Sequence, residues 1–430
     1  MIGGGAGSAW LAIACLRSGL RRIDIIEPRT EIGRGLAYST RSSLHLLNVP
    51  AEKMDADAQP GDPLFVDWLA RNHPDIGAFD YAPRAIYGDF LSETFAALSA
   101  SHDVRHHRTT VTAIHPLDGG GFAVELAGGK RLTAGAVVLA LGNLAPDPLA
   151  PTVSDARLVE DPWTLTPQRS AGHIMIAGTG LTALDAVATL ASGNDRARFS
   201  LHAGHPFVPP VDMRVDSWTG GEALAGLRPA AAMHAIRNAI GRSDDPDAWR
   251  TVVEGARLHT RDIWEAWSAA DRRTFWRHAA RHWLHRRHRT APATHALIQR
   301  LVSEGRLTIS SGRVTDIRVT GAGLTANIGG DERTAELIVN ATGPSLRLES
   351  NALLAQMARQ GVIAPDPLRI GIDMTDNCTV CDIRGQAVSN LHAIGPLTRG
   401  RFFEVTAVPH VRQQANMLAP LLARALTSAR

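Results

Sequence analysis

The chain has 430 residues, of which 44% are hydrophobic and 20% charged, and this ordinary globular composition excludes a disordered or collagen-like protein. Its length predicts two or three domains of average size. The 45 basic and 42 acidic residues nearly balance to a net charge of +3, so nucleic acid is not an expected partner.

The number of cysteines and the hydropathy of the chain predict the cellular location of the protein. The sequence has 3 cysteines, Cys15, Cys378 and Cys381, too few for a disulfide framework and typical of a reducing compartment. No apolar run reaches the ~18 residues that a membrane span needs, and no signal-peptide pattern is present. We therefore expect a cytoplasmic protein that has no membrane partner.

The chain opens on a glycine turn, a helix and a strand that ends in an acid. Gly3, Gly5 and Ser8 nearly fit the dinucleotide fingerprint, in which glycines allow a tight turn and let the backbone approach a pyrophosphate. Glu27 follows at about the 20-residue spacing at which an acid binds ribose hydroxyls. The pattern favours a nucleotide site over a plain tight turn.

A second fingerprint follows the apolar strand expected at residues 173–177. Gly178, Gly180 and Ala183 fit the G-x-G-x-x-A variant, and an apolar helix continues from there. Two such fingerprints in one chain are much less expected by chance than a single one, so together they favour nucleotide binding.

Each fingerprint precedes the same module of strand, hairpin, apolar strand and Ala-x-Gly turn. The first copy runs from Val111 to Gly142 and the second from Val314 to Gly343. Apolar strands bounded by glycines at this rhythm indicate a parallel sheet with an attached antiparallel meander. The repeat predicts two similar nucleotide domains.

The last segment has a strand at Leu391–Ile394, a turn at Gly395-Pro396 and a helix from about Pro409 to Leu426. A helix that begins after a buried strand places N–H groups where a ligand oxygen can bind.

At this point the sequence resembles the two-dinucleotide-domain flavoproteins, which include flavin-dependent monooxygenases and pyridine-nucleotide–disulfide oxidoreductases. Within them it is most similar to the bacterial FAD/NAD(P)-binding protein family. The matching stretches run nearly end to end: residues 33–40, 45–51, 84–90, 178–185, 286–292 and 395–414.

The resemblance implies an α/β fold with two Rossmann-like three-layer dinucleotide-binding domains, the FAD-binding one discontinuous. Its first part would span residues 1–165 and its second part 346–430. An NAD(P)-binding-like domain would span 166–345, with a helical insertion at about 206–300 that shapes the substrate site.

The resemblance also implies cofactor roles for particular residues. Those expected at FAD are Gly3, Gly5, Ser8 and Glu27 for its ADP half, Arg34 and Gly35 for its phosphates, Asn48 near the flavin, Gly142, and Gly395 with Pro396 over the flavin and ribityl chain. Gly178 and Gly180 would bind the nicotinamide cofactor.

Some positions depart from the family pattern. The family commonly has an arginine after the second-domain strand, but the segment Ser200–His205 has none, so NADH and NADPH both stay open. His410 stands where the family has a glutamate. Pro344 follows Ala-Thr-Gly where the ornithine and lysine hydroxylases tend to have tyrosine.

Other groups of residues give weaker indications of function. Cys378 and Cys381 form a C-x-x-C away from the place where disulfide reductases have theirs, and we expect neither redox nor zinc chemistry there. The basic segment 271–292 is a solvated face or a contact for an anionic substrate or cofactor phosphate. Its Phe275, Ala279 and Trp283 predict one buried helix face. We expect no metal site.

The expected function is that of an FAD-dependent oxidoreductase, a monooxygenase that uses NAD(P)H and oxygenates a small molecule through a flavin C4a-(hydro)peroxide. The alternatives are a reductase or dehydrogenase that passes electrons to a partner or quinone, and a nucleotide-binding protein without catalysis. Glu404, shortly after the Gly395 turn, is the candidate catalytic side chain, with a salt bridge to Arg399 or Arg401 as its structural alternative.

Only Met1 and Ile2 precede Gly3, whereas a strand usually has about 5–6 residues. We therefore expect the central strand of the first sheet to be nearly absent from this chain. A version extended upstream is expected to retain FAD better.

Overall fold

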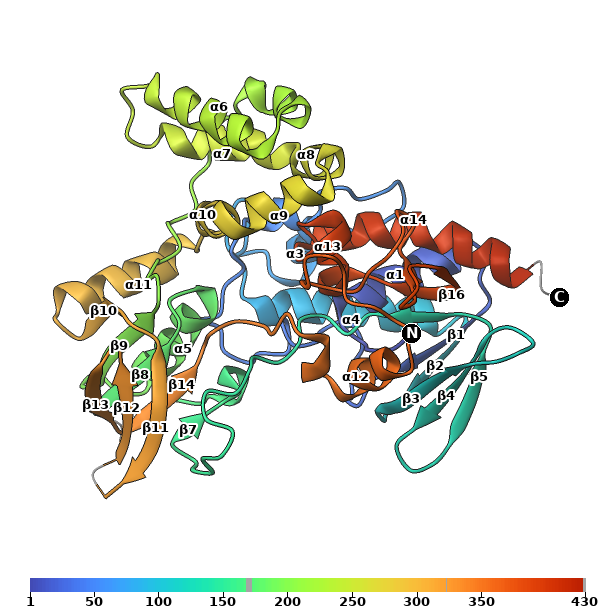
Figure 1. Cartoon of the computed structure of the whole chain (residues 1–430), viewed down its shortest axis with the longest axis horizontal. Coiled ribbons are helices and arrows are strands. Elements are labelled where there is room, and N and C mark those ends of the chain that lie inside the picture. Colours follow the sequence, from blue (N-terminus) through green and yellow to red (C-terminus); the bar gives the residue numbers. More distant parts are fainter. Residues whose placement is uncertain (168–171, 322, 428–430) are drawn as a thin grey trace.

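A computed structural model of the protein describes residues 1–167, 172–321 and 323–427. These residues form two α/β sheet domains that lie side by side, with a group of helices above them (Figure 1). The predicted fold class is confirmed.

Ile2 joins the sheet of the first domain at its centre. The strands are β1 (Arg22–Ile26), β2 (Asp103–His107), β6 (Val137–Leu139), β15 (Thr379–Cys381) and β16 (Ala387–Ala393). Their order is β15-β16-β6 on one side and β1-β2 on the other, and Ile2 forms parallel bridges to both Leu139 and Ile26. Ile2 therefore occupies the position of the central strand that the sequence predicts to be nearly absent.

Two layers cover this sheet. On one face lie α1 (Ala6–Arg17), α3 (Phe65–Asn72), α4 (Arg84–Ser99) and α14 (Val408–Thr427), and on the other lie β3 (Val111–Pro116), β4 (Phe122–Leu126), β5 (Arg131–Ala134) and α12 (Ala352–Arg359). Side chains along β6 alternate between the two faces of the sheet. Val138 packs into the core under the helices, whereas Val137 and Leu139 pack into the core under the meander. The short helix α2 (Ala51–Met54) precedes α3.

The second domain repeats this plan. Its parallel sheet has the order β10-β9-β8-β14-β7, with β7 (Leu158–Val159), β8 (His173–Ala177), β9 (Arg198–Ala203), β10 (Leu307–Ser311) and β14 (Leu337–Asn340). Helices α5 (Leu181–Ser192) and α11 (Pro292–Ser303) cover one face, and the meander β11 (Val314–Thr320), β12 (Gly323–Ile328) and β13 (Asp331–Ala335) covers the other. Strand β7 belongs to the range 1–165 that the sequence assigns to the first domain, but it pairs with β14 in the sheet of the second domain.

The helical insertion comprises α6 (Pro229–Gly241), α7 (Ala248–Leu258), α8 (Thr260–Ala266), α9 (Ala269–His278) and α10 (Ala280–Arg287). The prediction of one helix face through Phe275, Ala279 and Trp283 is wrong. The chain leaves helical geometry at Ala279, with φ −124°, and this separates α9 from α10. Because of the bend, Phe275 and Trp283 still reach a common core.

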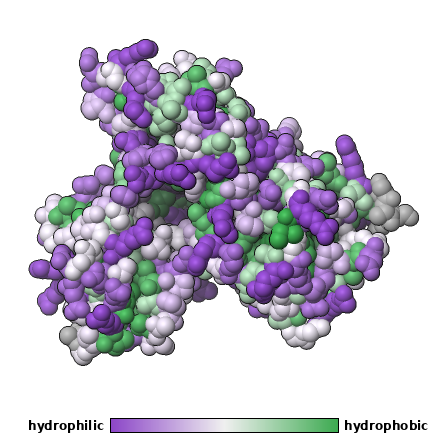
Figure 2. Space-filling view, viewed as in Figure 1, coloured by the Kyte–Doolittle hydropathy of each residue, from purple (hydrophilic) through white to green (hydrophobic). Residues whose placement is uncertain are grey.

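Phe403 attaches the insertion to the last segment of the chain. It follows α13 (Arg399–Phe402) with φ +59°, and its ring stacks on Trp264 at 4.5 Å between centroids. The Trp264 indole N–H donates to the Gly400 carbonyl at 3.2 Å. The surface is hollowed between the insertion and the second domain (Figure 2). Within the described residues, each helix is too short or too polar to cross a bilayer.

Candidate functional site

The first glycine turn leads from Ile2 into α1. Gly3 has φ +97°, and a Cβ there would lie 2.5 Å from the carbonyl oxygen of Ala140, so the position requires glycine. Gly5 is the N-cap of α1 and offers no side-chain cap, while the Ser8 hydroxyl donates to the Gly3 carbonyl. The first-turn N–H groups of α1 therefore suit an anion such as a diphosphate.

Glu27 lies directly against this turn, after β1. Its Oε2 accepts from the Gly4 N–H at 2.8 Å and its Oε1 from the Arg29 N–H at 3.1 Å. The carboxylate is thus held at the place that the sequence spacing predicts for a ribose-binding acid. Its contact with a ribose stays a prediction.

Residues 33–35 close the turn from the other side. The Gly33 N–H donates to the Gly4 carbonyl at 2.8 Å, and a Cβ on Gly35 would lie 2.9 Å from the Gly5 Cα. We name the pair of turns Gly3–Gly5 and Gly33–Gly35 the first cradle. Two backbones that approach this closely leave peptide N–H groups exposed to a phosphate chain, so the residues present fit the diphosphate of FAD.

Arg34 belongs to the same loop but its guanidinium is paired within the protein. It forms ion pairs with Glu31 and Asp89, and its Nη1 donates to the Ala85 carbonyl at 3.3 Å. The predicted phosphate contact of Arg34 stays a prediction that requires these pairs to rearrange.

We expect Gly35→Ala to weaken FAD binding by tenfold or more, on the order of 1.4 kcal/mol. The added Cβ would push the first cradle apart at a residue whose φ is +52°. Titration of the FAD-free protein with FAD measures the effect. Gly61→Ala is the matched control, because Gly61 also has a positive φ of +84° but no atom lies within 4 Å of its added Cβ. Equal losses in both variants would contradict the role of the cradle.

The Gly395 turn is held by buried polar groups that the sequence does not single out. The Gly395 N–H donates to Gln414 Oε1 at 2.7 Å, and Gln414 Nε2 donates to the Thr398 hydroxyl at 2.8 Å. No atom lies within 4 Å of a Cβ built on Gly395, which has φ +73°. Gln414, on α14, therefore fixes the turn and leaves its outer side open.

A small cavity, lined almost entirely by residues of the first domain, collects several of the predicted residues. Gly142 and Pro396 line it together with Ser345, which follows the Ala-x-Gly turn of the second domain, and with Arg399. Burial lowers the pKa of Arg399, and the neighbouring Arg287 adds to this effect. The structure thus brings the first Ala-x-Gly turn and the Gly395 turn to one place.

Asn48 lies half-buried in the loop before α2, and no hydrogen bond from its side chain occurs among the described residues. Its proximity to the flavin stays a prediction. The loop is tied to the second domain nearby, because His45 Nε2 lies 2.7 Å from the Thr189 hydroxyl and Arg84 forms a 2.8 Å ion pair with Asp185.

The second glycine turn leads from β8 into α5. Gly178 has φ +127°, its N–H donates to the His202 carbonyl at 2.7 Å, and a Cβ would lie 2.1 Å from the Ala341 carbonyl oxygen. Gly180 is the N-cap of α5, and no atom lies within 4 Å of its added Cβ. The turn therefore offers an open helix start, as the first one does, and fits a second nucleotide.

Glu404 is buried in an ion pair. Arg287 Nε lies 2.7 Å from its Oε2, and the Trp283 indole N–H donates to its Oε1 at 2.8 Å. Burial favours a raised pKa, but Arg287 and Trp283 outweigh it and hold the Glu404 pKa below its ordinary value. Glu404 does form a salt bridge, as the structural alternative predicts, but the predicted partners Arg399 and Arg401 are wrong. Its partner is Arg287, and Arg401 pairs with Asp376 instead.

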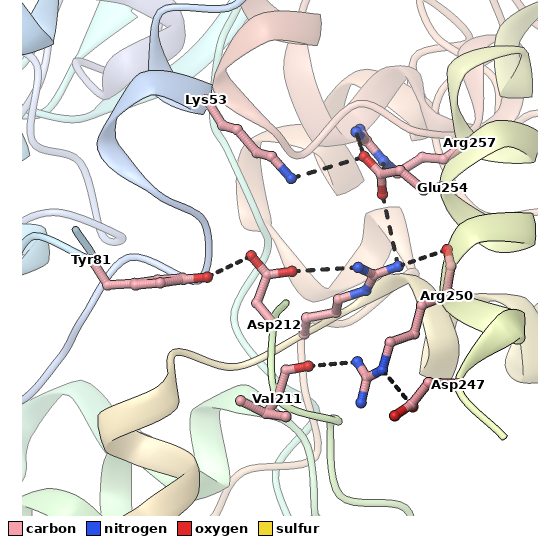
Figure 3. Close-up of polar contacts among 9 residues, drawn as sticks. Lys53, Tyr81, Val211, Asp212, Asp247, Arg250, Glu254 and Arg257 are labelled. Carbon is pink, nitrogen blue, oxygen red and sulfur yellow. Dashed lines mark hydrogen bonds and ion pairs between the residues drawn. The ribbon is translucent and has the colours of Figure 1, made fainter. Parts of the chain in front are cut away.

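A second group of polar and charged residues, from the first domain and from the insertion with its flanking segments, forms a network of its own (Figure 3). The Tyr81 hydroxyl donates to Asp212 at 2.8 Å, and Arg289 lies 3.5 Å from Asp212 and 3.7 Å from Glu254. Lys53 Nζ lies 3.9 Å from Glu254. With Arg257, which is 2.6 Å from Glu254, these residues are named the junction cluster. Sequence reasoning missed it, because its members come from distant segments.

The C-x-x-C cysteines are both buried and unpaired. Burial raises the pKa of Cys378 to about 12 and also raises that of Cys381, so neither thiol is activated as a dithiol reductant needs. In the part of the chain that the structure describes, no group of three or more His, Cys, Asp or Glu side chains is placed to hold a metal ion.

Residues 1–144 match the model of the family described as FAD-NAD(P)-binding. No curated protein matches the sequence. Among solved structures, the ornithine hydroxylase of Pseudomonas aeruginosa in its reduced form matches with a TM-score of 0.67 and 17% identity over 99% of this chain and 98% of that one.

Two further structures have the same fold. The ornithine N-hydroxylase of Kutzneria sp. 744, with reduced FAD, NADP+ and L-ornithine, matches with a TM-score of 0.68 and 14% identity over 100% of this chain and 98% of that one. The bacillithiol disulfide reductase of Bacillus cereus matches with a TM-score of 0.58 and 14% identity over 98% and 97%. The chain therefore begins with an FAD-NAD(P)-binding domain and has the fold of these flavoenzymes throughout.

Proposed function

We propose that this protein is an FAD-dependent oxidoreductase that takes electrons from NAD(P)H and oxygenates a small molecule. One observation carries the proposal: each sheet domain has a glycine turn at the start of a helix, Gly3–Gly5 before α1 and Gly178–Gly180 before α5, and both turns suit a nucleotide phosphate. The likeness to enzymes described as ornithine hydroxylases supports the oxygenase reading.

Each part of the chain has a distinct task in this proposal. FAD, when bound, supplies the transfer of electrons from NAD(P)H to O₂ and to the substrate. The first cradle and Glu27 hold its ADP half, and the Gly395 turn, fixed by Gln414, supports its other half. Gly178 and Gly180 hold the second nucleotide at the start of α5.

The aromatic core of the insertion and the junction cluster shape the substrate side. Trp283 and Phe403 exclude water from the region beside Glu404, because both rings are buried. Lys53 and Glu254 present both signs of charge there, which suits a small polar substrate. The scarcity of cysteine further supports a cytoplasmic setting.

Absorbance and rapid mixing test the proposal. We expect the purified protein to bind FAD, NAD(P)H to bleach the flavin without oxygen, and O₂ to restore it. A screen of amino acids and small amines for substrate-dependent NAD(P)H oxidation then identifies the substrate. A protein that stays colourless at saturating FAD would overturn the proposal. Bleaching followed by electron transfer only to a quinone would favour the reductase reading.

A further inference from the structure

The helical insertion encloses a cavity of its own, and no residue of the two glycine turns lines it. Its empty volume is about 400 Å³, which includes the space at its mouth. Helices α6 to α10 all contribute to the lining (Figure 1), together with the residue that follows α13. We name this space the aromatic cavity after the five buried aromatic side chains that line it: Trp264, Trp267, Phe275, Trp283 and Phe403.

The indole N–H groups around the aromatic cavity are bonded to protein acceptors. That of Trp267 donates to the Leu227 carbonyl at 2.7 Å, and that of Trp283 donates to Glu404 at 2.8 Å. The N–H of Trp264 donates to a backbone carbonyl in the same way. The rings therefore offer carbon surface to the cavity and keep their hydrogen-bond donors for the protein.

Thr260 supplies the hydroxyl group of the lining. It donates to the Arg257 carbonyl at 2.9 Å, so its proton is already used. A buried water needs roughly two to four polar partners, which this lining does not provide. The aromatic cavity therefore suits an apolar group better than water. The remaining lining residues are all aliphatic or methionine: Leu224, Ala232, Met233, Ile236, Ala256 and Ile263.

Aromatic rings also bind cations, but the charges around this cavity oppose one. The Arg272 guanidinium already lies over the Trp264 ring, 5.4 Å from its centroid, and Phe403 stacks against the same ring. Burial and then the neighbouring Arg401 lower the pKa of Arg272, so a further positive charge is disfavoured there. Within the described residues, no acidic side chain lines the cavity. The group that fits is therefore uncharged.

Phe403 connects the aromatic cavity to the Gly395 turn, because α13 alone separates the two along the chain. Its φ of +59° is a left-handed conformation that is costly for phenylalanine. Strain of this kind persists where the surrounding structure holds it, and it clusters at ligand sites. The next residue, Glu404, accepts the Trp283 N–H. A ring in the cavity would thus lie against two side chains that also contact the Glu404 segment.

We propose that the aromatic cavity binds the uncharged aromatic end of the small-molecule substrate. This rests on the proposed function. Ring-on-ring packing adds to the gain from burying apolar surface there. The end of the substrate that is oxygenated stays outside the cavity, because the lining has no free polar partner for it. The insertion then selects substrates that are aromatic at one end and polar at the other.

Binding of indole to the FAD-loaded protein tests the site. We expect indole to bind and to shift the methyl resonance of Met233, which lines the cavity. Ala232→Leu fills the cavity from α6 and is expected to weaken binding about tenfold. Ala231→Leu is the matched control, because it makes the same change one residue earlier on α6, where the side chain is exposed. Equal effects of the two variants would overturn the site.

Two further measurements guard this result. Ala256→Val fills the cavity from α7 with a smaller change and is expected to weaken indole binding as well, even if Ala232→Leu folds poorly. Tetramethylammonium is expected to leave the Met233 resonance unchanged. A shift caused by this cation would overturn the assignment of an uncharged ligand.

Turnover separates this inference from the proposed function. In a screen of amines and amino acids, compounds with an aromatic end are expected to have about tenfold higher kcat/KM than aliphatic ones with the same polar end. Ala232→Leu is expected to remove this preference and to leave flavin reduction by NAD(P)H unchanged. Turnover without the preference overturns the inference alone. Indole binding at Met233 in a protein whose flavin NAD(P)H does not reduce overturns the proposed function alone.

Discussion

Gly178→Ala is expected to destabilise the protein by about 3 kcal/mol, from backbone strain and overpacking together. At φ +127° the new Cβ would lie 2.1 Å from the Ala341 carbonyl oxygen, so β8 and β14 would have to separate. Those strands are paired at the centre of the second sheet. The shift of the urea midpoint measures the cost, and the second domain is expected to unfold first.

Gly180→Ala is the matched control two residues away. Its φ is −80°, and no atom lies within 4 Å of the added Cβ, so stability is expected to fall by no more than about 1 kcal/mol. The methyl group would stand where the second nucleotide approaches the start of α5, so NAD(P)H binding is expected to weaken about tenfold. A loss of stability at Gly180 as large as that at Gly178 would contradict this division of roles.

Glu404→Ala is expected to cost about 3–5 kcal/mol, because it leaves the Arg287 guanidinium buried without its partner. The Trp283 N–H also loses its acceptor. Replacing both charges, as in Glu404→Leu with Arg287→Met, is expected to cost less than Glu404→Ala alone. Urea unfolding of the single and double variants measures the coupling, and additive costs would show that the pair is not coupled.

The same pair has a defined pH dependence. Since the folded state lowers the Glu404 pKa, its contribution to stability is present at neutral pH and is lost as the pH falls through that lowered value. The stability difference between the unaltered protein and Glu404→Gln is therefore expected to shrink only below the ordinary carboxyl range. A difference that shrinks at neutral pH would contradict a lowered pKa.

Flavin kinetics address the predicted catalytic role of Glu404. A positioning role predicts that Glu404→Gln alters the substrate KM and leaves the rate of flavin reduction by NAD(P)H unchanged. A fall in the oxidation rate at saturating substrate, with stability preserved, would instead support the catalytic role.

The sequence by itself determined the fold class and the places of both glycine turns. Gly3 and Gly178 are recognisable because each needs a positive φ and a close backbone contact, and both requirements follow from a local fingerprint. The meander repeat is equally local, since apolar strands and glycine hairpins alternate at short range. Glu27 was found by spacing alone, because one helix and one strand separate it from its turn.

Only the tertiary structure decided which side chains meet. Tyr81, Asp212 and Arg289 come from three separate segments, and no spacing rule joins them. Arg313 reaches the end of β9 because strands β9 and β10 pair in parallel, although more than a hundred residues separate Gly204 from Arg313 in the sequence. Periodicity and propensity encode local conformation, whereas contacts between distant segments depend on how whole layers pack, and the candidate site is built from such contacts.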